Sequence, residues 1–130
     1  MLVQEIIRTH IITGELEMPI SAALDIMDIH QLRAIPIVNP SGILVGILTE
    51  GDVYRCLTSR SFKYTDYIQN IMNSTVVTIN LDSTVEEAYS LLNSSGFNRL
   101  PVTDPFGRYV GIISRIDVLQ ALLAEDESEK

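Results

Sequence analysis

The sequence repeats itself at a fixed offset. When Pro36 is aligned with Pro101 (101 − 36 = 65), much of the remaining chain matches without a gap. The identical pairs include Pro40 with Pro105, Gly42 with Gly107, Gly46 with Gly111 and Asp52 with Asp117. Identity at prolines, glycines and an acid in one ungapped register indicates two copies of a single structural unit. We therefore expect one repeat at residues 1–62 and a second at residues 63–130.

Both repeats begin with the same two predicted elements. A short apolar strand is expected at residues 11–13 and again at residues 76–79. An amphipathic helix follows, because apolar residues recur at i, i+3, i+4 and i+7. These residues are Ile20, Ala23, Leu24 and Met27 in the first repeat, and Val85, Ala88, Tyr89 and Leu92 in the second. Thr84-Val85-Glu86-Glu87 has the form of a capping box, and Gly96 has the position of a terminator.

A strand, a turn and a second strand come next in each repeat. The turns are Asn39-Pro40-Ser41-Gly42 and Asp104-Pro105-Phe106-Gly107, a combination that favours tight turns. Pro36 and Pro101 lack a backbone N–H, so their strands should be edge strands or be irregular there. A last helix is expected from near Glu50 and Arg115. The predicted fold is α+β, with two β-α-β-β-α units packed through their sheets.

Composition narrows the possible functions. The chain has 130 residues, of which 46% are hydrophobic, and a formal net charge of −8. Such a chain can bury a core, and its charge disfavours nucleic acid and anionic membrane surfaces as partners. No apolar run is long enough to insert into a membrane. The single cysteine, Cys56, excludes an internal disulfide and suits the cytoplasm.

The pattern resembles a known family. In both repeats an apolar strand with an internal proline leads through a turn into Gly-apolar-apolar-Ser/Thr-x-x-Asp, at residues 46–52 and 111–117. This pattern resembles the CBS domain, named after cystathionine β-synthase, over nearly the whole chain. The resemblance implies a pseudo-twofold pair, often called a Bateman module. It also implies clefts between the repeats that bind AMP, ADP, ATP or S-adenosylmethionine, and a homodimer that regulates an enzyme or transporter.

Each residue of the Ser/Thr-x-x-Asp motif has two interpretations. Asp52 and Asp117 could accept hydrogen bonds from both hydroxyls of a ribose, as acids do in dinucleotide sites. Equally, an acid in the first turn stabilises a helix without any ligand. Thr49 and Ser114 could cap the helix or assist a bound anion.

The remaining candidates would contact the base and the phosphate. The resemblance implies that the ends of the first strands contact adenine, and exposed arginines are suitable phosphate partners. The expected ligand-binding residues are Thr13, Arg33, Pro36, Thr49, Asp52, Val77, Thr78, Arg99, Leu100, Pro101, Ser114, Arg115 and Asp117. Arg115 lies inside the second motif, where the first has Glu50, so we expect phosphorylated ligands to prefer the site around Asp117. For each of these candidate residues, an ordinary role in the core or at the surface is the alternative interpretation.

No catalytic or metal-binding pattern is evident. His10 and His30 lack partners at metal-ligand spacing, and no nucleophile-base arrangement or P-loop is present. We therefore expect a non-enzymatic module that senses an adenosine-containing ligand and needs no cofactor. The alternative is a ligand-free module that dimerises or docks onto a partner domain.

Overall fold

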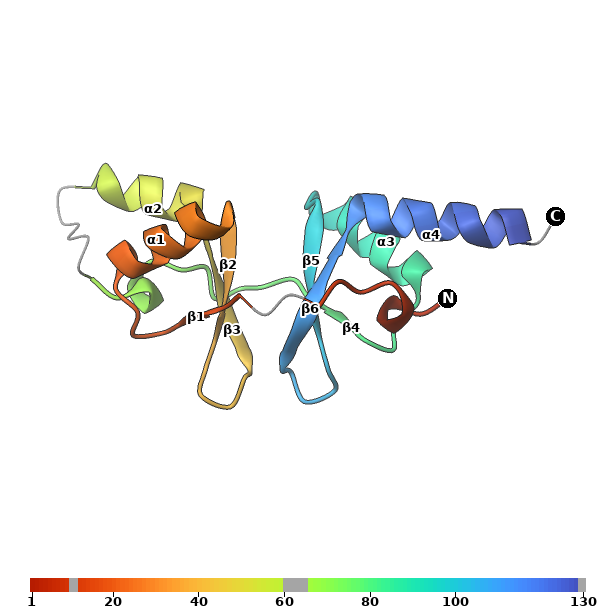
Figure 1. Cartoon of the computed structure of the whole chain (residues 1–130), viewed down its shortest axis with the longest axis horizontal. Coiled ribbons are helices and arrows are strands. Elements are labelled where there is room, and N and C mark those ends of the chain that lie inside the picture. The colour runs from red at the N-terminus through yellow and green to blue at the C-terminus, as the bar shows by residue number, and fades with distance from the viewer. Residues whose placement is uncertain (10–11, 60–65, 129–130) are drawn as a thin grey trace. The chain divides into compact units, whose positions relative to one another are not determined.

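The computed structural model describes residues 1–9, 12–59 and 66–128, and it has the predicted α+β composition. The first β-α-β-β-α series consists of β1 (Gly14–Glu15), α1 (Ile20–His30), β2 (Ala34–Val38), β3 (Leu44–Thr49) and α2 (Glu50–Leu57). The second consists of β4 (Ile79–Asn80), α3 (Val85–Ser95), β5 (Arg99–Thr103), β6 (Tyr109–Ser114) and α4 (Arg115–Ser128). Two short 3₁₀ helices, Val3–Glu5 and Ile68–Asn70, precede them. The predicted order of elements is confirmed (Figure 1).

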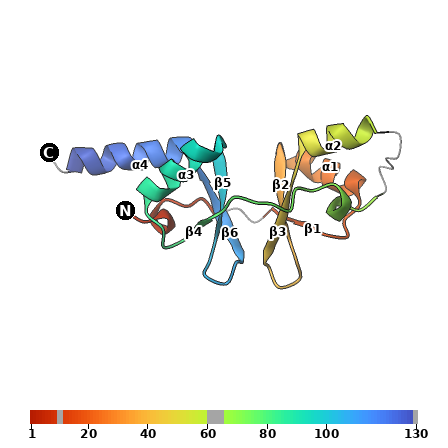
Figure 2. The ribbon, with the colours of Figure 1, turned by 180° about the vertical axis from the view of Figure 1, so that it is seen from behind.

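Packing divides the chain differently from the sequence repeat. One compact unit is Ile12–Val76, and the other combines Met1–Ile11 with Val77–Lys130. Within each unit the two α-helices lie together on one side of the long β-hairpin, as Figure 1 and the reverse view in Figure 2 show. The repeat boundaries expected at residues 1–62 and 63–130 stay a prediction about the sequence repeat.

Each unit is completed by the segment that opens the other repeat. Val3 is fully buried among residues of the second repeat, and its N–H donates a 2.8 Å hydrogen bond to the carbonyl of Ser83. Ile68, its repeat mate (3 + 65 = 68), is fully buried in the first unit and donates to the carbonyl of Met18 at 2.9 Å. The two segments therefore occupy equivalent places in the two units, and each supplies part of a core that its own repeat does not form.

The helices bury the faces that their periodicity predicts. In α1 the side chains of Ile20, Ala23 and Met27 are buried, but Leu24 is exposed. In α3 the side chains of Val85, Ala88 and Leu92 are fully buried. The hydroxyl oxygen of Thr84 accepts a 3.1 Å hydrogen bond from the N–H of Glu87, which is one half of the expected capping box, and Gly96 ends the helix as expected.

The prolines do not lie in edge strands. The strand orders are β1-β2-β3 and β4-β5-β6, so the expectation that Pro36 and Pro101 occupy edge strands is wrong. Pro36 is tolerated because its partner in β3, Ile47, exchanges both backbone hydrogen bonds (2.9 Å each) with Asn73 on the opposite side. The β2–β3 ladder therefore needs no N–H from Pro36. The prolines themselves are in register, and the irregularity follows each of them, as a shift between Ile37 and Val38 and between Val102 and Thr103.

The opening strands begin later than predicted. They were expected at residues 11–13 and 76–79, but β1 is Gly14–Glu15 and β4 is Ile79–Asn80. Ile11 lies outside the described residues. Gly14 and Glu15 have low strand propensity, yet they pair in parallel with Ile37 and Val38. Strand propensity did not locate β1, because backbone pairing with β2 decides the position of this two-residue strand.

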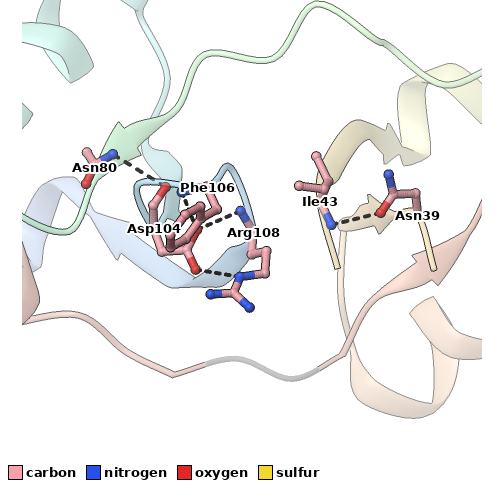
Figure 3. A network of polar contacts seen from close by, with 6 residues as sticks. All are labelled: Asn39, Ile43, Asn80, Asp104, Phe106 and Arg108. Atoms are coloured by element: carbon pink, nitrogen blue, oxygen red, sulfur yellow. Dashed lines mark hydrogen bonds and ion pairs between the residues drawn. The ribbon is translucent and has the colours of Figure 1, made fainter. Parts of the chain in front are cut away.

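The hairpin turns lie where they were predicted, and side-chain hydrogen bonds fix them. Figure 3 shows the carboxylate of Asp104 accepting from the N–H of Phe106 (2.9 Å) and from the N–H and Nε of Arg108 (3.0 and 2.8 Å). In the other hairpin Oδ1 of Asn39 accepts from the N–H of Ile43 at 3.0 Å. Gly42 and Gly107 close the turns with φ of 82° and 85°, a region that favours glycine.

The packing of the exchanged segment against β6 gives a stability prediction. A Cβ added at Gly111 would lie 2.6 Å from the carbonyl oxygen of Arg8, a backbone atom that cannot turn aside. We expect Gly111→Ala to lower the free energy of unfolding by about 1–3 kcal/mol, the usual range for overpacking. Urea denaturation would measure the change.

Gly51→Ala is the matched control. The nearest atom to a Cβ at Gly51 is Nη1 of the flexible Arg55 side chain, at 3.4 Å. Gly51 lies in α2, where alanine is a better helix former than glycine by roughly 0.5–1 kcal/mol. Gly51→Ala should therefore leave the protein as stable or more stable. Equal losses from both substitutions would contradict the close-packing argument.

Candidate functional site

The two motif aspartates are buried charges. Asp52 is 7% exposed and Asp117 is 8% exposed, and they lie in the first turns of α2 and α4. A carboxylate so far removed from water needs hydrogen-bond or ion-pair partners to remain charged. The arrangement of those partners defines the candidate site in each unit.

Asp52 has partners from its own helix end. Its N–H donates to Oγ1 of Thr49 at 3.1 Å, and its Oδ2 accepts from the N–H of Thr49 at 2.9 Å, which together form a capping box. Its Oδ1 is ion-paired with Nη2 of Arg55, three residues further along α2. The structural interpretation of Thr49-x-x-Asp52 is therefore realised, with an arginine added.

Asp117 has an arginine partner from far along the chain. Its N–H donates to Oγ of Ser114 at 3.2 Å. Arg8, 109 residues away, donates from Nε to Oδ2 at 3.1 Å and from Nη2 to Oδ1 at 2.8 Å. Such a two-point guanidinium–carboxylate pair is among the stronger polar contacts in proteins. The backbone places Arg8 there, because its N–H and carbonyl exchange hydrogen bonds with Ile112 (3.1 and 3.0 Å).

These contacts shift the pKa of Asp117. Burial alone would raise the pKa, but the hydrogen bond with the Ser114 side chain and the guanidinium of Arg8 outweigh burial and hold the pKa of Asp117 below its usual range. The carboxylate is therefore charged at neutral pH and is available as a hydrogen-bond acceptor.

Arg115 has a structural contact in the second unit. Its Nη2 donates to the carbonyls of Leu92 (3.0 Å) and Phe97 (2.9 Å), at the end of α3. It therefore adds a second donor to the carbonyl of Leu92, which already accepts from the N–H of Gly96, and ties the end of α3 to the carbonyl of Phe97 beyond it. Arg33 and Arg99 are exposed at the ends of β2 and β5. Arg99 is the register partner of Ser114 in the sheet.

The other predicted residues lie along the strands. Pro36, Leu100 and Pro101 are buried in β2 and β5. Thr13, Val77 and Thr78 are half-buried just before β1 and β4. Thr78 also lines an open hollow of about 680 Å³ with polar and acidic side chains of α3, among them Glu86, Glu87 and Ser90. Asp117 does not line this hollow, so it is a separate feature.

Sequence reasoning missed Arg8 and Arg55. Arg55 was detectable, since an arginine three residues after an acid on a helix lies close to it. Arg8 was not, because the exchange of opening segments determines its contact with Asp117. Among the described residues, no group of three or more His, Cys, Asp or Glu side chains is placed to hold a metal ion. No helix in the described part of the chain is long and apolar enough to cross a membrane.

The lowered pKa predicts a specific acid sensitivity. Because the folded pKa of Asp117 is depressed, its stabilisation is present above the ordinary carboxyl pKa of about 3.9 and is lost as the pH falls through the folded pKa. We expect the free energy of unfolding to decrease below about pH 4, and less steeply in Asp117→Asn than in the wild type. Urea unfolding across the acid range measures both slopes. Identical slopes in the wild type, Asp117→Asn and Arg8→Gln would contradict this role.

Comparison with known proteins shows the family. The CBS domain family matches residues 3–59 and 68–124. An uncharacterised protein of Methanopyrus kandleri is 34% identical over 98% of this chain and 67% of its own length. Inosine-5′-monophosphate dehydrogenase of Methanocaldococcus jannaschii is 28% identical over 89% of this chain, which spans only 22% of the enzyme.

Solved structures have the same fold. The CBS domain pair of protein MJ0100, in complex with 5′-methylthioadenosine and S-adenosyl-L-methionine, has a TM-score of 0.77 and 28% identity, covering 96% of this chain and 98% of that one. The CBS-pair protein CBSX2 from Arabidopsis thaliana has a TM-score of 0.79 and 21% identity, covering 97% and 96%. With two matches in tandem and the expected order of elements in each, the chain belongs to the CBS domain family.

Proposed function

We propose that the chain is a regulatory module that binds an adenosine-containing ligand at the sites of Asp117 and Asp52. The observation that carries the proposal is the buried carboxylate in the first turn of α4, whose arginine partner is largely exposed. A ribose diol offers two O–H donors that match the two oxygens of such a carboxylate. Support comes from the CBS pair of protein MJ0100, which was solved with two adenosine compounds.

The other predicted residues have roles in this proposal. Thr13, Val77 and Thr78, just before β1 and β4, would contact adenine. The buried side chains of Pro36, Leu100 and Pro101 would form the apolar wall, with Thr49 and Ser114 beside the ribose. The exposed guanidinium groups of Arg33 and Arg99 are free to reach a phosphate more readily than that of Arg115, which is bonded to carbonyls. We propose binding without turnover, in the cytoplasm.

A ligand-free docking or dimerisation module is the second candidate. The complete capping box around Asp52 favours it, because that acid already has a structural role without a ligand. Exposed apolar side chains on α2 and α4 also favour it: Tyr54, Leu57, Ile116, Leu119 and Leu123. The apolar side chains of Ile20, Ala23, Met27 and Val53 are buried in the core of the unit and do not contribute to such a surface.

The proposed binding has a direct test. The wild-type protein should show a rise in melting temperature with at least one of AMP, ADP, ATP, S-adenosylmethionine and 5′-methylthioadenosine, because a ligand that binds only the native state stabilises it. Chromatography should recover the ligand unchanged. Asp117→Ala should weaken binding by about tenfold, the effect of losing roughly 1.4 kcal/mol. No thermal shift and no calorimetric heat with any of the five would favour the docking module.

We also propose a twofold homodimer formed through α2 and α4. Ile116, Leu119 and Leu123 lie at i, i+3 and i+7 of α4, and all three are exposed. Such an apolar stripe is typical of a covered surface. Light scattering at micromolar concentration should give twice the chain mass for the wild type and one chain mass for the double substitution Leu119→Asp, Leu123→Asp. Phe106→Ser, at an exposed hairpin tip, is the control that should stay dimeric. A monomeric wild type would end this proposal.

A further inference from the structure

Each buried aspartate is paired with an arginine from a different repeat position. Arg55 follows Asp52 by three residues, whereas Arg8 reaches Asp117 from the opening segment. At the 65-residue offset, the mate of Arg8 is Asn73 and the mate of Arg55 is Gln120, both uncharged. The shared fold therefore does not require an arginine at either position, since each unit is built without one of the two. Both acids nevertheless have a guanidinium partner.

The two pairs also share an unequal exposure. In both, the aspartate side chain is 8% exposed and the arginine side chain is 71% exposed. A structural salt bridge in a core would bury both partners. Here the cation is at the surface above a buried anion, so the guanidinium can leave the carboxylate and remain solvated. The acid cannot leave, and it needs new donors when the arginine moves.

A bound ribose would supply those donors and would displace the guanidinium of Arg8 from the carboxylate of Asp117. Its two hydroxyls replace the two N–H groups that Arg8 donates to Asp117, so the buried carboxylate stays satisfied. The displaced guanidinium then needs an anionic partner within reach of its side chain. A 5′-phosphate provides one, and guanidinium binds phosphate with the same two-point geometry. A neutral nucleoside leaves Arg8 without a partner, and a sulfonium group places a second positive charge near it.

We infer that Arg8 is a specificity-determining residue that exchanges Asp117 for the phosphate of the ligand, so this site selects adenosine 5′-phosphates over adenosine and cationic adenosyl compounds. The inference rests on the proposed function, and it extends to Arg55 at Asp52, where the guanidinium donates to Oδ1 alone and the N–H of Thr49 donates to Oδ2. From its place in the sequence motif, Arg115 was expected to favour phosphorylated ligands. This inference assigns the phosphate contact to Arg8 instead, because the guanidinium of Arg115 donates to the carbonyls of Leu92 and Phe97.

The test compares AMP with adenosine by calorimetry at neutral pH. The wild type should bind AMP at least about tenfold more tightly than adenosine. In Arg8→Gln, AMP affinity at one site should fall about tenfold, and adenosine affinity should stay the same or rise, because the carboxylate no longer has a competing cation. Arg8→Lys keeps the positive charge but lacks the two-point geometry of a guanidinium. Its AMP affinity should therefore lie between those of the wild type and Arg8→Gln. Arg55→Gln should produce the same change at the other site.

A matched control separates this role from a purely structural one. Arg108 is also paired with an aspartate, Asp104, at 2.8 Å, but on a hairpin turn. Arg108→Gln should leave the ratio of AMP to adenosine affinity unchanged. A ratio that Arg8→Gln also leaves unchanged, including equal weakening of both ligands, would overturn the inference. Tighter wild-type binding of S-adenosylmethionine than of AMP would overturn it too but keep the proposed function. Absence of binding by adenosine and by all of AMP, ADP, ATP, S-adenosylmethionine and 5′-methylthioadenosine would overturn both.

Discussion

The backbone bridge on the outer edge of each hairpin is the contact on which the rest of each unit depends. Arg8 pairs with Ile112 in one unit and Asn73 pairs with Ile47 in the other, and 8 and 73 are repeat mates. The bridge covers part of an edge that would otherwise present free N–H and carbonyl groups. It fixes the segment whose apolar anchor, Val3 or Ile68, completes the core. Without this segment, each unit would lack both an edge partner and a core residue.

Two sequence features follow from this bridge. The glycine of the Gly-apolar-apolar motif allows the backbone of the opening segment to approach, as the 2.6 Å distance from a Cβ at Gly111 to the carbonyl oxygen of Arg8 shows. The proline one strand away is permitted because Ile47 and Ile112 direct their hydrogen bonds to the bridge, not to the proline. The glycine and the proline therefore both reflect how the outer edge of the hairpin is paired.

Local sequence signals predicted the fold well, but they did not predict contacts between residues that are far apart in the sequence. The element order, the buried faces of α1 and α3, the turn at Asp104 and the cap at Thr84 all follow from residues within a few positions of one another. The edge assignment of Pro36 and the position of β1 failed because pairing with distant residues decides both. The site divides in the same way: Thr49, Asp52, Ser114 and Asp117 were identifiable by spacing, whereas the contact of Arg8 depends on the exchange of segments.

The acidic composition makes the placement of each arginine important. The chain has nine basic and seventeen acidic residues, so its overall field repels phosphate. Within the described residues six are arginines, and four of them contact a named partner: Arg8, Arg55, Arg108 and Arg115. The partners of Arg108 and Arg115 belong to a turn and a helix end, and both contacts are complete within the fold. Arg8 and Arg55 instead pair with the aspartates of the Ser/Thr-x-x-Asp motif, which gives them a charge that an incoming anion can take over. Anion binding by so acidic a chain has to depend on such local cations, because the net charge opposes it.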